Sequence, residues 1–491
     1  MIQTDIKKDT ITNKYTCQKG FKMKNTIFTF KDSSPKYKQI YEKFKSFIEQ
    51  GDIKADEPLP SIRQLADSLH VSRNTTLMAY EQLVAEGYIR GEGRKGYFVN
   101  ELEPVLFHEA RSSSAHKQTE PVPSVRIDFR ADVVDQSHFP LKTWRRISNQ
   151  VLMEKDSFRY GEPFGEWGLR EQIAAYLLQS RGVRTEPDAI IIGSSTQQML
   201  VYLGLVLKHD FSSVIVEDPG YDGARKAFQL NRFTLETLPV YETGADFSHL
   251  EQMKSRLIYV APSHHSPYGV SMPIQQRHAL IHWAKNRQGY IIEDDYDSEY
   301  RYTQQPFPAL ASIDSTRVIY LGNFSKCFLP GIRLSYMVLP QPLISCYKNQ
   351  FAHFESTTSL LSQFAMAKFM EEGEWNRHIK RMRLVYKRKM QHFVSELRKY
   401  FTHHISIIGE QSGLYVLVKV HLERSEEWLI QQASLQGVKV YPTSLFFIKN
   451  KTDHPIVRLG FSNLSTDEIQ LGVKLLTKAW LQNDGFNSSS F

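Results

Sequence analysis

The spacing of apolar side chains divides the chain into stretches of different character. Residues 1–30 are polar and aperiodic, which is typical of a disordered tail. From Pro35 apolar residues recur at steps of three and four until Gly51, which predicts a helix. A second helix is predicted from Ser61, because Ser61 and Gln64 have the spacing of a capping box.

A third helix is predicted after a short turn. Ser72 is suited to cap its start, because a serine oxygen accepts hydrogen bonds from the free N–H groups of a first turn. Two short strands, Tyr88–Arg90 and Gly96–Val99, then flank a glycine-rich turn. The order helix, helix, turn, helix, hairpin predicts a small, mainly α domain over residues 31–100. The expected inner face of the third helix is Thr76, Ala79, Tyr80 and Leu83.

The rest of the chain has a different pattern. Residues 101–126 lack periodicity and are rich in serine and proline, which is typical of a flexible linker. Over residues 127–485 short apolar runs alternate with helical stretches, which predicts a large α/β domain with a mainly parallel sheet. Residues 486–491 form a short tail. The strand candidates are Ala189–Ile192, Ser213–Val216, Leu257–Val260, Tyr290–Ile292, Val318–Leu321 and Leu334–Leu339.

The composition is that of a folded protein with more than one domain. The 491 residues are 41% hydrophobic and 23% charged, and no apolar run approaches the roughly 20 residues that cross a bilayer. A cytoplasmic location without a membrane partner is therefore the default expectation. The three cysteines have neither paired nor metal-ligand spacing, so we expect no disulfide framework and no metal site.

The net charge of +8 fits a polyanionic partner without identifying one. Residues 31–100 carry 11 Lys/Arg and 10 Asp/Glu, a net charge of only +1. Any contact of this domain with DNA must therefore depend on where its charges lie. The run Arg377–Lys399 contains nine Lys/Arg and one Glu. It is either the solvated face of a long helix or an extension of a DNA-facing surface in a dimer.

Polar residues of the small domain have the arrangement of a DNA-reading helix-turn-helix. Phosphate contacts are expected from the start of the preceding helix and from the hairpin tip, and base contacts from the first turn of the third helix. The first group is Arg63, Arg94, Lys95 and Gly96, and the second is Ser72, Arg73, Asn74 and Thr75. The alternative is a helical protein-interaction module whose polar residues are only solvated.

The segment Gly91–Gly96 also fits the pattern GxGxxG of dinucleotide-binding loops. It precedes a strand, whereas a dinucleotide loop precedes a helix. We therefore interpret it as a wing. With the motifs Leu59-Pro-Ser-x-Arg63-x-Leu-Ala66, Val71–Thr75 and Gly96–Val99, residues 31–100 resemble the winged helix of GntR-type bacterial regulators. The resemblance implies a double-stranded DNA operator.

Polar runs follow five of the strands of the large domain. Because ligands in open α/β sheets bind beyond the carboxyl ends of the strands, we expect these runs to converge on one site. An acid, a lysine and an arginine occur there in the order Asp294, Lys326, Arg333. An aldehyde cofactor with a ring nitrogen and a phosphate requires these residue types. The runs are Gly193–Gln197, Glu217–Tyr221, Ala261–Gly269, Asp294–Tyr296 and Gly322–Lys326.

This half of the chain resembles the fold-type I aminotransferases, which bind pyridoxal 5′-phosphate, over nearly all of residues 127–485. Further motifs of the resemblance are Tyr160-Gly-Glu-Pro-x-Gly-x-x-Gly-Leu-Arg170 and Val457-Arg-Leu-Gly-Phe461. The resemblance implies that Lys326 forms the internal aldimine and that Asp294 faces the pyridine nitrogen.

The same resemblance assigns the other cofactor contacts. It implies that Tyr296 hydrogen-bonds the ring hydroxyl and that Tyr221 stacks on the ring. Arg333 would pair with the phosphate, and Arg458 would bind the carboxylate of an amino acid ligand. The phosphate itself would lie at the start of a helix, against Ser195, Thr196 and Gln197.

Three positions depart from the aminotransferase pattern. Ser195 stands where glycine is usual, Asn323 where Ser or Thr often precedes the lysine, and Ser266 where many aminotransferases have asparagine. These departures leave cofactor binding intact and weaken the expectation of efficient transamination. His264 and His265 could either form loop hydrogen bonds or take part in catalysis.

A winged helix, a linker and an aminotransferase-like half in this order resemble the MocR subfamily of GntR-type transcription regulators. The resemblance implies a homodimer in which the DNA-binding domains cross to the partner. Our hypothesis is that an amino acid or amine exchanges with Lys326 on the cofactor and thereby changes the conformation of the large domain. Two alternatives remain open: an active aminotransferase with an appended DNA-binding domain, and a repressor whose large domain serves only for dimerisation.

Overall fold

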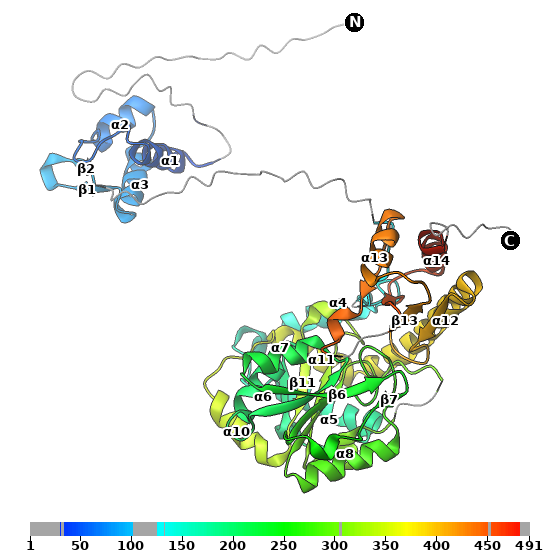
Figure 1. Cartoon of the computed structure of the whole chain (residues 1–491). Coiled ribbons are helices and arrows are strands. Elements are labelled where there is room, and N and C mark those ends of the chain that lie inside the picture. The colour runs from blue at the N-terminus through cyan, green and yellow to red at the C-terminus, as the bar shows by residue number, and fades with distance from the viewer. Residues whose placement is uncertain are drawn as a thin grey trace, which may run out of the picture. The chain divides into compact units, whose positions relative to one another are not determined.

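The computed structural model describes residues 30, 34–101, 125–131, 133–303, 307–449 and 453–481. The chain divides into two compact units, Met1–Glu120 and Pro121–Phe491 (Figure 1). The tails expected at the two termini and most of the expected linker lie outside the described residues.

The N-terminal unit is a three-helix domain with a short hairpin, as expected. Both expected helix caps form: Ser61 and Gln64 make a reciprocal capping box, and Ser72 Oγ accepts the N–H of Thr75 at 3.1 Å. Its elements are α1 (Lys36–Glu49), α2 (Ile62–Leu69), α3 (Arg73–Ala85), β1 (Ile89–Gly91) and β2 (Tyr97–Val99).

Tyr80 joins the parts of this unit. Its side chain is fully buried, and its ring packs edge-on against Phe44 of α1 and Tyr97 of β2. Its hydroxyl donates to the carbonyl of Pro60, ahead of α2, at 2.9 Å. The pairing of β1 with β2 is antiparallel, which confirms that Gly91–Gly96 is the turn of a hairpin and not a dinucleotide loop.

The C-terminal unit contains an eight-stranded sheet with the order β4-β11-β10-β9-β8-β5-β6-β7. All six expected strands are present. The strands are β4 (Ile190–Gly193), β5 (Ser213–Asp218), β6 (Thr234–Tyr241), β7 (Gly244–Ala245), β8 (Leu257–Val260), β9 (Tyr290–Asp295), β10 (Val318–Asn323) and β11 (Ser335–Val338).

The expectation of a mainly parallel sheet is confirmed for its centre, where β10, β9, β8, β5 and β6 pair in parallel. Strand β11 is antiparallel to both of its neighbours. Only the eleven residues from Phe324 to Leu334 connect β10 to β11, and a parallel crossover needs about a dozen or more. This short connection contains Lys326 and Arg333.

Helices cover the sheet on both faces (Figure 1). The helices of this part of the chain are α4 (Leu141–Leu152), α5 (Trp167–Arg181), α6 (Thr196–Leu207), α7 (Asp222–Leu230), α8 (Ile274–Asn286), α9 (Leu310–Ile313), α10 (Gln341–Phe351) and α11 (Leu360–Glu371), and the long α12 (Glu374–Phe401) lies beside α14 (Thr466–Leu481). In the described part of the chain no helix is both long and apolar enough to cross a membrane.

A second sheet near the C-terminus was not expected from the sequence. It is antiparallel, with the order β12-β13-β16-β15, and α13 (Glu426–Leu435) and α14 (Thr466–Leu481) accompany it. Its strands are β12 (Ile405–Ile408), β13 (Tyr415–Val420), β15 (Tyr441–Pro442) and β16 (Ile456–Gly460).

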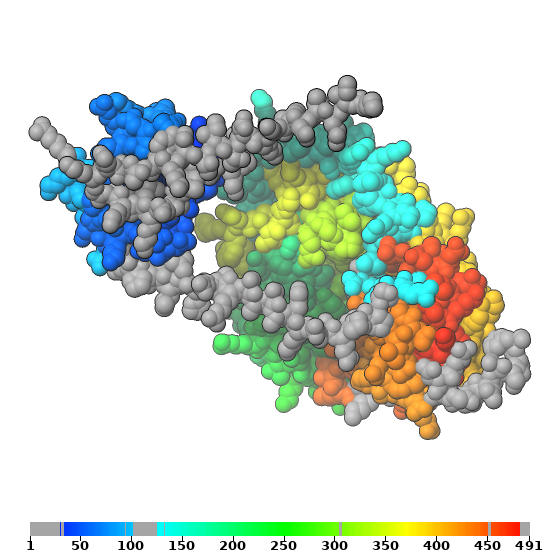
Figure 2. Space-filling model, turned by 90° about the horizontal axis from the view of Figure 1, so that it is seen from above, coloured from blue at the N-terminus to red at the C-terminus, as the bar shows by residue number. Residues whose placement is uncertain are grey.

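The start of the unit joins this C-terminal part. Strand β3 (Ile127–Asp128) pairs in parallel with β14 (Val438–Lys439). The ring of Phe129 lies against Gly472 of α14, where an added Cβ would lie 2.6 Å from it. Figure 2 shows the cyan residues at the start of the unit beside orange α13 and red α14.

Candidate functional site

The loops that follow β5, β8 and β9 meet at the carboxyl edge of the large sheet. The N–H of Ala261 donates to Glu217 at 3.1 Å, and His265 Nε2 donates to the carbonyl of Pro219 at 3.0 Å. The hydroxyl of Tyr296 lies 3.2 Å from His264 Nδ1. The structure thus brings three of the five expected polar runs into direct contact.

Asp294 is the penultimate residue of β9 and lies buried in this site. Its side chain is 5% exposed, and Oδ2 accepts a hydrogen bond from the hydroxyl of Tyr259 on β8. Within the described chain its other oxygen, Oδ1, is buried without a hydrogen-bond partner. Burial raises the pKa of Asp294 to about 7. A buried acceptor without a partner is costly, and the N–H of a protonated pyridine ring would satisfy it.

Tyr296 lies in a cluster of hydrogen-bonded rings. His264 Nδ1 lies 2.6 Å from Oδ1 of buried Asp297, which fixes the imidazole beside Tyr296. Burial raises the pKa of Tyr296 well above its ordinary value, so its hydroxyl is a neutral donor. That is the state in which it can hydrogen-bond a ring oxygen, as the resemblance implies.

Tyr221 and Gln197 come together across the first turn of α7. A Cβ added at Gly223 would lie 2.4 Å from the Tyr221 ring and 2.7 Å from Gln197 Nε2. Glycine at position 223 is therefore required for the ring to lie flat against the helix. The loops after β4 and β5 are thereby placed next to each other.

The start of α6 is suited to bind an anion. Ser195 Oγ accepts the N–H of Gln198 at 3.2 Å and so caps the helix. In the described part of the chain no hydrogen bond uses the N–H groups of Ser195, Thr196 or Gln197. Free N–H groups at a helix N-terminus favour a phosphate.

Lys326 lies half-buried in the connection from β10 to β11. Its Nζ donates to the carbonyl of Ala131 at 3.3 Å. Arg333, seven positions later, is exposed in the left-handed conformation (φ 55°) and makes no ion pair within the described residues. The structure places neither side chain in hydrogen-bond contact with Asp294.

Arg458 of β16 lies with its guanidinium over two aromatic rings, 5.6 Å from the centre of Tyr415 and 5.3 Å from that of Phe446. Tyr415 in turn contacts the His264 ring, with 5.9 Å between ring centres. Arg458 therefore reaches the same ring cluster as Tyr296, on the side of the small C-terminal sheet.

In the N-terminal unit, the expected base-reading residues differ in how freely they are presented. Arg73 and Asn74 are exposed at the first turn of α3. Ser72 and Thr75 instead hydrogen-bond each other, with 2.7 Å between their hydroxyl oxygens. Their first role is therefore to fix the start of the helix.

Arg63 and Lys95, two of the expected phosphate-binding residues, are exposed. Arg63 is 3.9 Å from Asp67, and Lys95 is 3.7 Å from Glu92, and all of these contacts are solvent-exposed pairs that a phosphate can replace. Arg94 lies in the 3₁₀ turn Gly93–Lys95, and Gly96 has a φ of 107° that favours glycine.

Comparison with known proteins agrees with this arrangement. Residues 36–99 match the family of bacterial regulatory proteins of the gntR type, and residues 130–476 match aminotransferase class I and II. The HTH-type transcriptional regulator YdeL of Bacillus subtilis is 40% identical over 453 residues, 91% of this chain and 97% of that protein. The probable rhizopine catabolism regulatory protein MocR of Rhizobium meliloti is 31% identical, over 91% and 94%.

The chain belongs to the MocR subfamily of GntR-type transcription regulators. Among solved structures, the α-aminoadipate aminotransferase LysN of Thermus thermophilus is 27% identical with a TM-score of 0.64, over 72% of this chain and 91% of that one. These matches confirm the expected fold of both units and pyridoxal 5′-phosphate as the expected cofactor class.

Two departures of this MocR-type regulator from the aminotransferase pattern have structural explanations. Ser195 has an extended backbone (φ −169°), which any residue adopts, so glycine is not needed there. Asn323 Oδ1 accepts the N–H of Ser325 at 3.0 Å and fits the turn before Lys326. The third, Ser266, hydrogen-bonds Tyr415.

Two of the groups that the sequence left open are now placed. His264 is the buried partner of Asp297, and burial lowers the pKa of His265 to about 3, so that His265 is a neutral loop hydrogen-bonder.

Cys327 is 1% exposed and its thiol donates to Glu299 at 2.9 Å. Burial raises its pKa well above the ordinary value, which makes it a packing residue.

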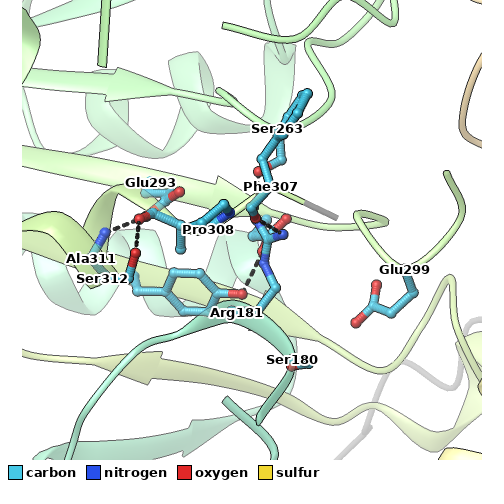
Figure 3. Close-up of polar contacts among 12 residues, drawn as sticks. Ser180, Arg181, Ser263, Glu293, Glu299, Phe307, Pro308, Ala311 and Ser312 are labelled. Carbon is cyan, nitrogen blue, oxygen red and sulfur yellow. Dashed lines mark hydrogen bonds and ion pairs between the residues drawn. The ribbon is translucent and has the colours of Figure 1, made fainter. Parts of the chain in front are cut away.

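Sequence reasoning missed Tyr259 and the buried groups that hold β9. Arg181 reaches Asp295 at 2.7 Å and Ser263 at 2.6 Å. Glu293 accepts the N–H groups at the start of α9, including that of Ala311 at 3.0 Å (Figure 3). These contacts fix the strand that ends in Asp294.

Proposed function

We propose that this MocR-type regulator binds an operator through its winged helix and senses an amino acid or amine at Lys326. One observation carries the proposal. The amine of Lys326 and the strand that bears Arg458 both contact the segment Phe129–Ala131. That segment lies directly after β3, at the point where the chain arrives from the DNA-binding unit.

The residues of the site fit pyridoxal 5′-phosphate. Asp294 Oδ1 would accept the ring N–H, Tyr296 would donate to the ring hydroxyl, and Tyr221 would cover one ring face. The N–H groups of Ser195, Thr196 and Gln197 would hold the phosphate, with Arg333 as its second partner. When bound, the cofactor supplies an aldehyde carbon that Lys326 or an incoming amine can occupy.

An effector amine that took the place of Lys326 on the cofactor would leave its Nζ to another partner. Ala131 offers its carbonyl at 3.3 Å in the structure. The effector carboxylate would act on the same segment from the other side, through Arg458. The backbone N–H of Gly460, two residues beyond Arg458, donates to the Phe129 carbonyl at 2.8 Å.

This contact is tight. A Cβ at Gly460 would lie 2.5 Å from the Ala131 Cα, so β16 and the segment Phe129–Ala131 cannot shift independently. The amino group and the carboxylate of an amino acid would therefore both act on the segment Phe129–Ala131. This segment follows the expected linker at 101–126. By linkage, operator and effector change each other's affinity by the same factor.

On the DNA side, Arg73 and Asn74 would read base edges, with Ser72 and Thr75 fixing their helix. Arg63, Arg94, Lys95 and the N–H of Gly96 would hold phosphates. A regulator that binds an operator in this way is expected in the cytoplasm.

We also propose a homodimer, in which each DNA-binding unit crosses to the partner. Three large apolar side chains between α4 and α5 are almost fully exposed: Met153 (82%), Phe158 (82%) and Tyr160 (85%). An exposed cluster of this kind marks a contact surface, because monomeric proteins rarely leave one in water.

An absorption titration tests the sensing proposal. Purified protein with bound cofactor is titrated with a panel of amino acids and amines, and operator binding is followed at each point. The visible absorption of the lysine-bound cofactor should change with an effector amine, and operator affinity should change at the same concentration. Lys326→Ala should lose both responses, whereas Lys285→Ala, a surface variant on α8, should keep them.

The two alternatives predict different results. Release of a keto acid from the amino donor at ordinary enzymatic rates, with unchanged operator affinity, would establish an aminotransferase. A protein whose operator binding is the same with and without cofactor, and the same in Lys326→Ala, would have a large domain that serves only for dimerisation.

A further inference from the structure

A second pocket of about 170 Å³ opens on the C-terminal unit between α5, the turn after β9 and α12. None of its lining residues is one expected to contact the cofactor, although Arg181 among them also holds Asp295 and Ser263. Among them are Gln179, Ser180, Glu299, Asn376, Lys380 and Arg383. At roughly 30 Å³ of liquid volume per water, the space suits a ligand of about six non-hydrogen atoms.

The floor of the pocket is the carboxylate of Glu299. Its Oε1 accepts the hydroxyl of Tyr176 at 2.7 Å, and its Oε2 accepts the thiol of Cys327 at 2.9 Å. Each carboxylate oxygen retains a second lone pair, so Glu299 can still accept from a ligand. In Figure 3 Glu299 stands apart from the contacts of Arg181, on the side of Ser180.

Two of the lining residues on α12 are positively charged. Arg383 Nε donates to the carbonyl of Glu299 at 2.9 Å, which directs the guanidinium along the pocket. Within the described residues its two outer nitrogens form no ion pair, and neither does Lys380, which is exposed. Besides Arg181, which is paired with Asp295, the pocket therefore presents the Glu299 carboxylate from the turn after β9 and the two cations Lys380 and Arg383 from α12.

We propose that this pocket binds a second small molecule, a zwitterion, with its carboxylate on Arg383 and Lys380 and its ammonium group on Glu299. Such a ligand satisfies both signs of charge at once. A simple anion would be attracted by Lys380 and Arg383 but repelled by Glu299. A simple amine would be attracted by Glu299 but repelled by the two cations.

The elements that line the pocket also hold Cys327, the residue next to Lys326. Besides its thiol contact with Glu299, Cys327 has its carbonyl bound by the hydroxyl of Tyr300 at 3.1 Å and by His378 Nε2 at 2.9 Å. His378 lies on α12, and Tyr300 follows Glu299. A ligand that draws α12 towards the turn therefore shifts the support of Lys326. This goes beyond aldimine-based sensing, since the pocket is occupied without reaction at Lys326.

The probe for the test is N,N-dimethylglycine, a zwitterion without a primary amine, which cannot take the place of Lys326 on the cofactor. Binding is measured by calorimetry on the full chain with bound cofactor. We expect saturable binding to the wild type, and at least ten-fold weaker binding to Lys380→Gln and Arg383→Gln. Arg381→Gln, on the same helix but outside the pocket, and Arg458→Gln, in the cofactor site, should bind as the wild type does.

Lys380 is exposed and without a contact that folding requires, so its variant keeps the test valid if Arg383→Gln is unstable. Glu299→Gln should bind dimethylglycine no better than acetate. Binding lost in Arg458→Gln and kept in Lys380→Gln would place the ligand in the cofactor site and overturn the proposal. Equal affinity for acetate or inorganic phosphate in the wild type would overturn the role of Glu299, and absence of binding would overturn the site itself.

Discussion

Replacing Tyr259 by phenylalanine should weaken cofactor binding in a way that depends on pH. Tyr259 is 2% exposed and donates its hydroxyl to Asp294 Oδ2. The substitution removes one oxygen and leaves the ring, so the packing of β8 against β9 is kept. What changes is the stability of the Asp294 carboxylate, which the ring N–H of the cofactor requires.

The size of the effect follows from the pKa of Asp294, which burial raises to about 7 and which the Tyr259 hydroxyl lowers. A hydrogen bond to a charged group contributes about 1.5–3 kcal/mol, so its loss raises the pKa by a further one to two units or so. The ionised fraction at pH 7 then falls from about a half to roughly 1–10%. Apparent affinity falls in proportion, by roughly 5- to 50-fold.

At pH 9 the carboxylate is almost fully ionised in the wild type and about half or more ionised in the variant, so the affinities should agree within about two-fold. The assay is a fluorescence or absorption titration of cofactor-free protein with pyridoxal 5′-phosphate at several pH values. The matched control is Tyr320→Phe, because Tyr320 of β10 donates to Asp295, the neighbouring carboxylate that pairs with Arg181. Weakening by the same factor at pH 7 and pH 9, or equal weakening in the control, would refute the reasoning.

Three further predictions concern other parts of the molecule. Arg73→Ala should relax base preference by roughly ten- to a hundred-fold at one operator position. Lys95→Ala should instead weaken binding to all DNA sequences alike and reduce the slope of log K against log salt by about 0.9. Equal effects of both variants on every DNA sequence would contradict this division. Leu83→Ala, at a fully buried position, should lower the stability of the N-terminal unit by about 2–5 kcal/mol while calorimetry shows the large unit unfolding as in the wild type. Phe158→Glu should shift sedimentation towards the monomer, and Lys478→Glu, at an exposed position of α14, should not.

The sequence was sufficient to predict the strands but not the direction of all of them. An apolar run such as Leu334–Leu339 indicates a buried strand whichever way it points, because burial on both faces removes the alternation that would orient it. The direction of β11 could have been predicted from the length of the connection, since the eleven residues between β10 and β11 are too few for a parallel crossover.

The candidate site shows the same limit. Asp294, Lys326 and Tyr221 could be found from motif order, since each follows a strand. Tyr259 could not, because within Leu257–Val260 it is one more apolar residue of a buried strand. Its role depends on register: Tyr259 pairs with Ile292, which places it diagonally across from Asp294 on the same face of the sheet. Pairing register between distant segments is a tertiary property that a single sequence does not display.

The three positions at which the chain departs from the aminotransferase pattern do not distinguish a sensor from an enzyme. Ser195 caps α6 without needing glycine, and Asn323 fits the turn before Lys326, so only Ser266 still departs without such an account. Slow transamination is therefore compatible with a sensor. The distinction lies in what happens when Lys326 is released. In an enzyme that event is one step of turnover, whereas in our proposal it changes the contact with Ala131. Operator affinity measured with and without effector decides between them, because linkage requires the operator to change effector affinity by the same factor.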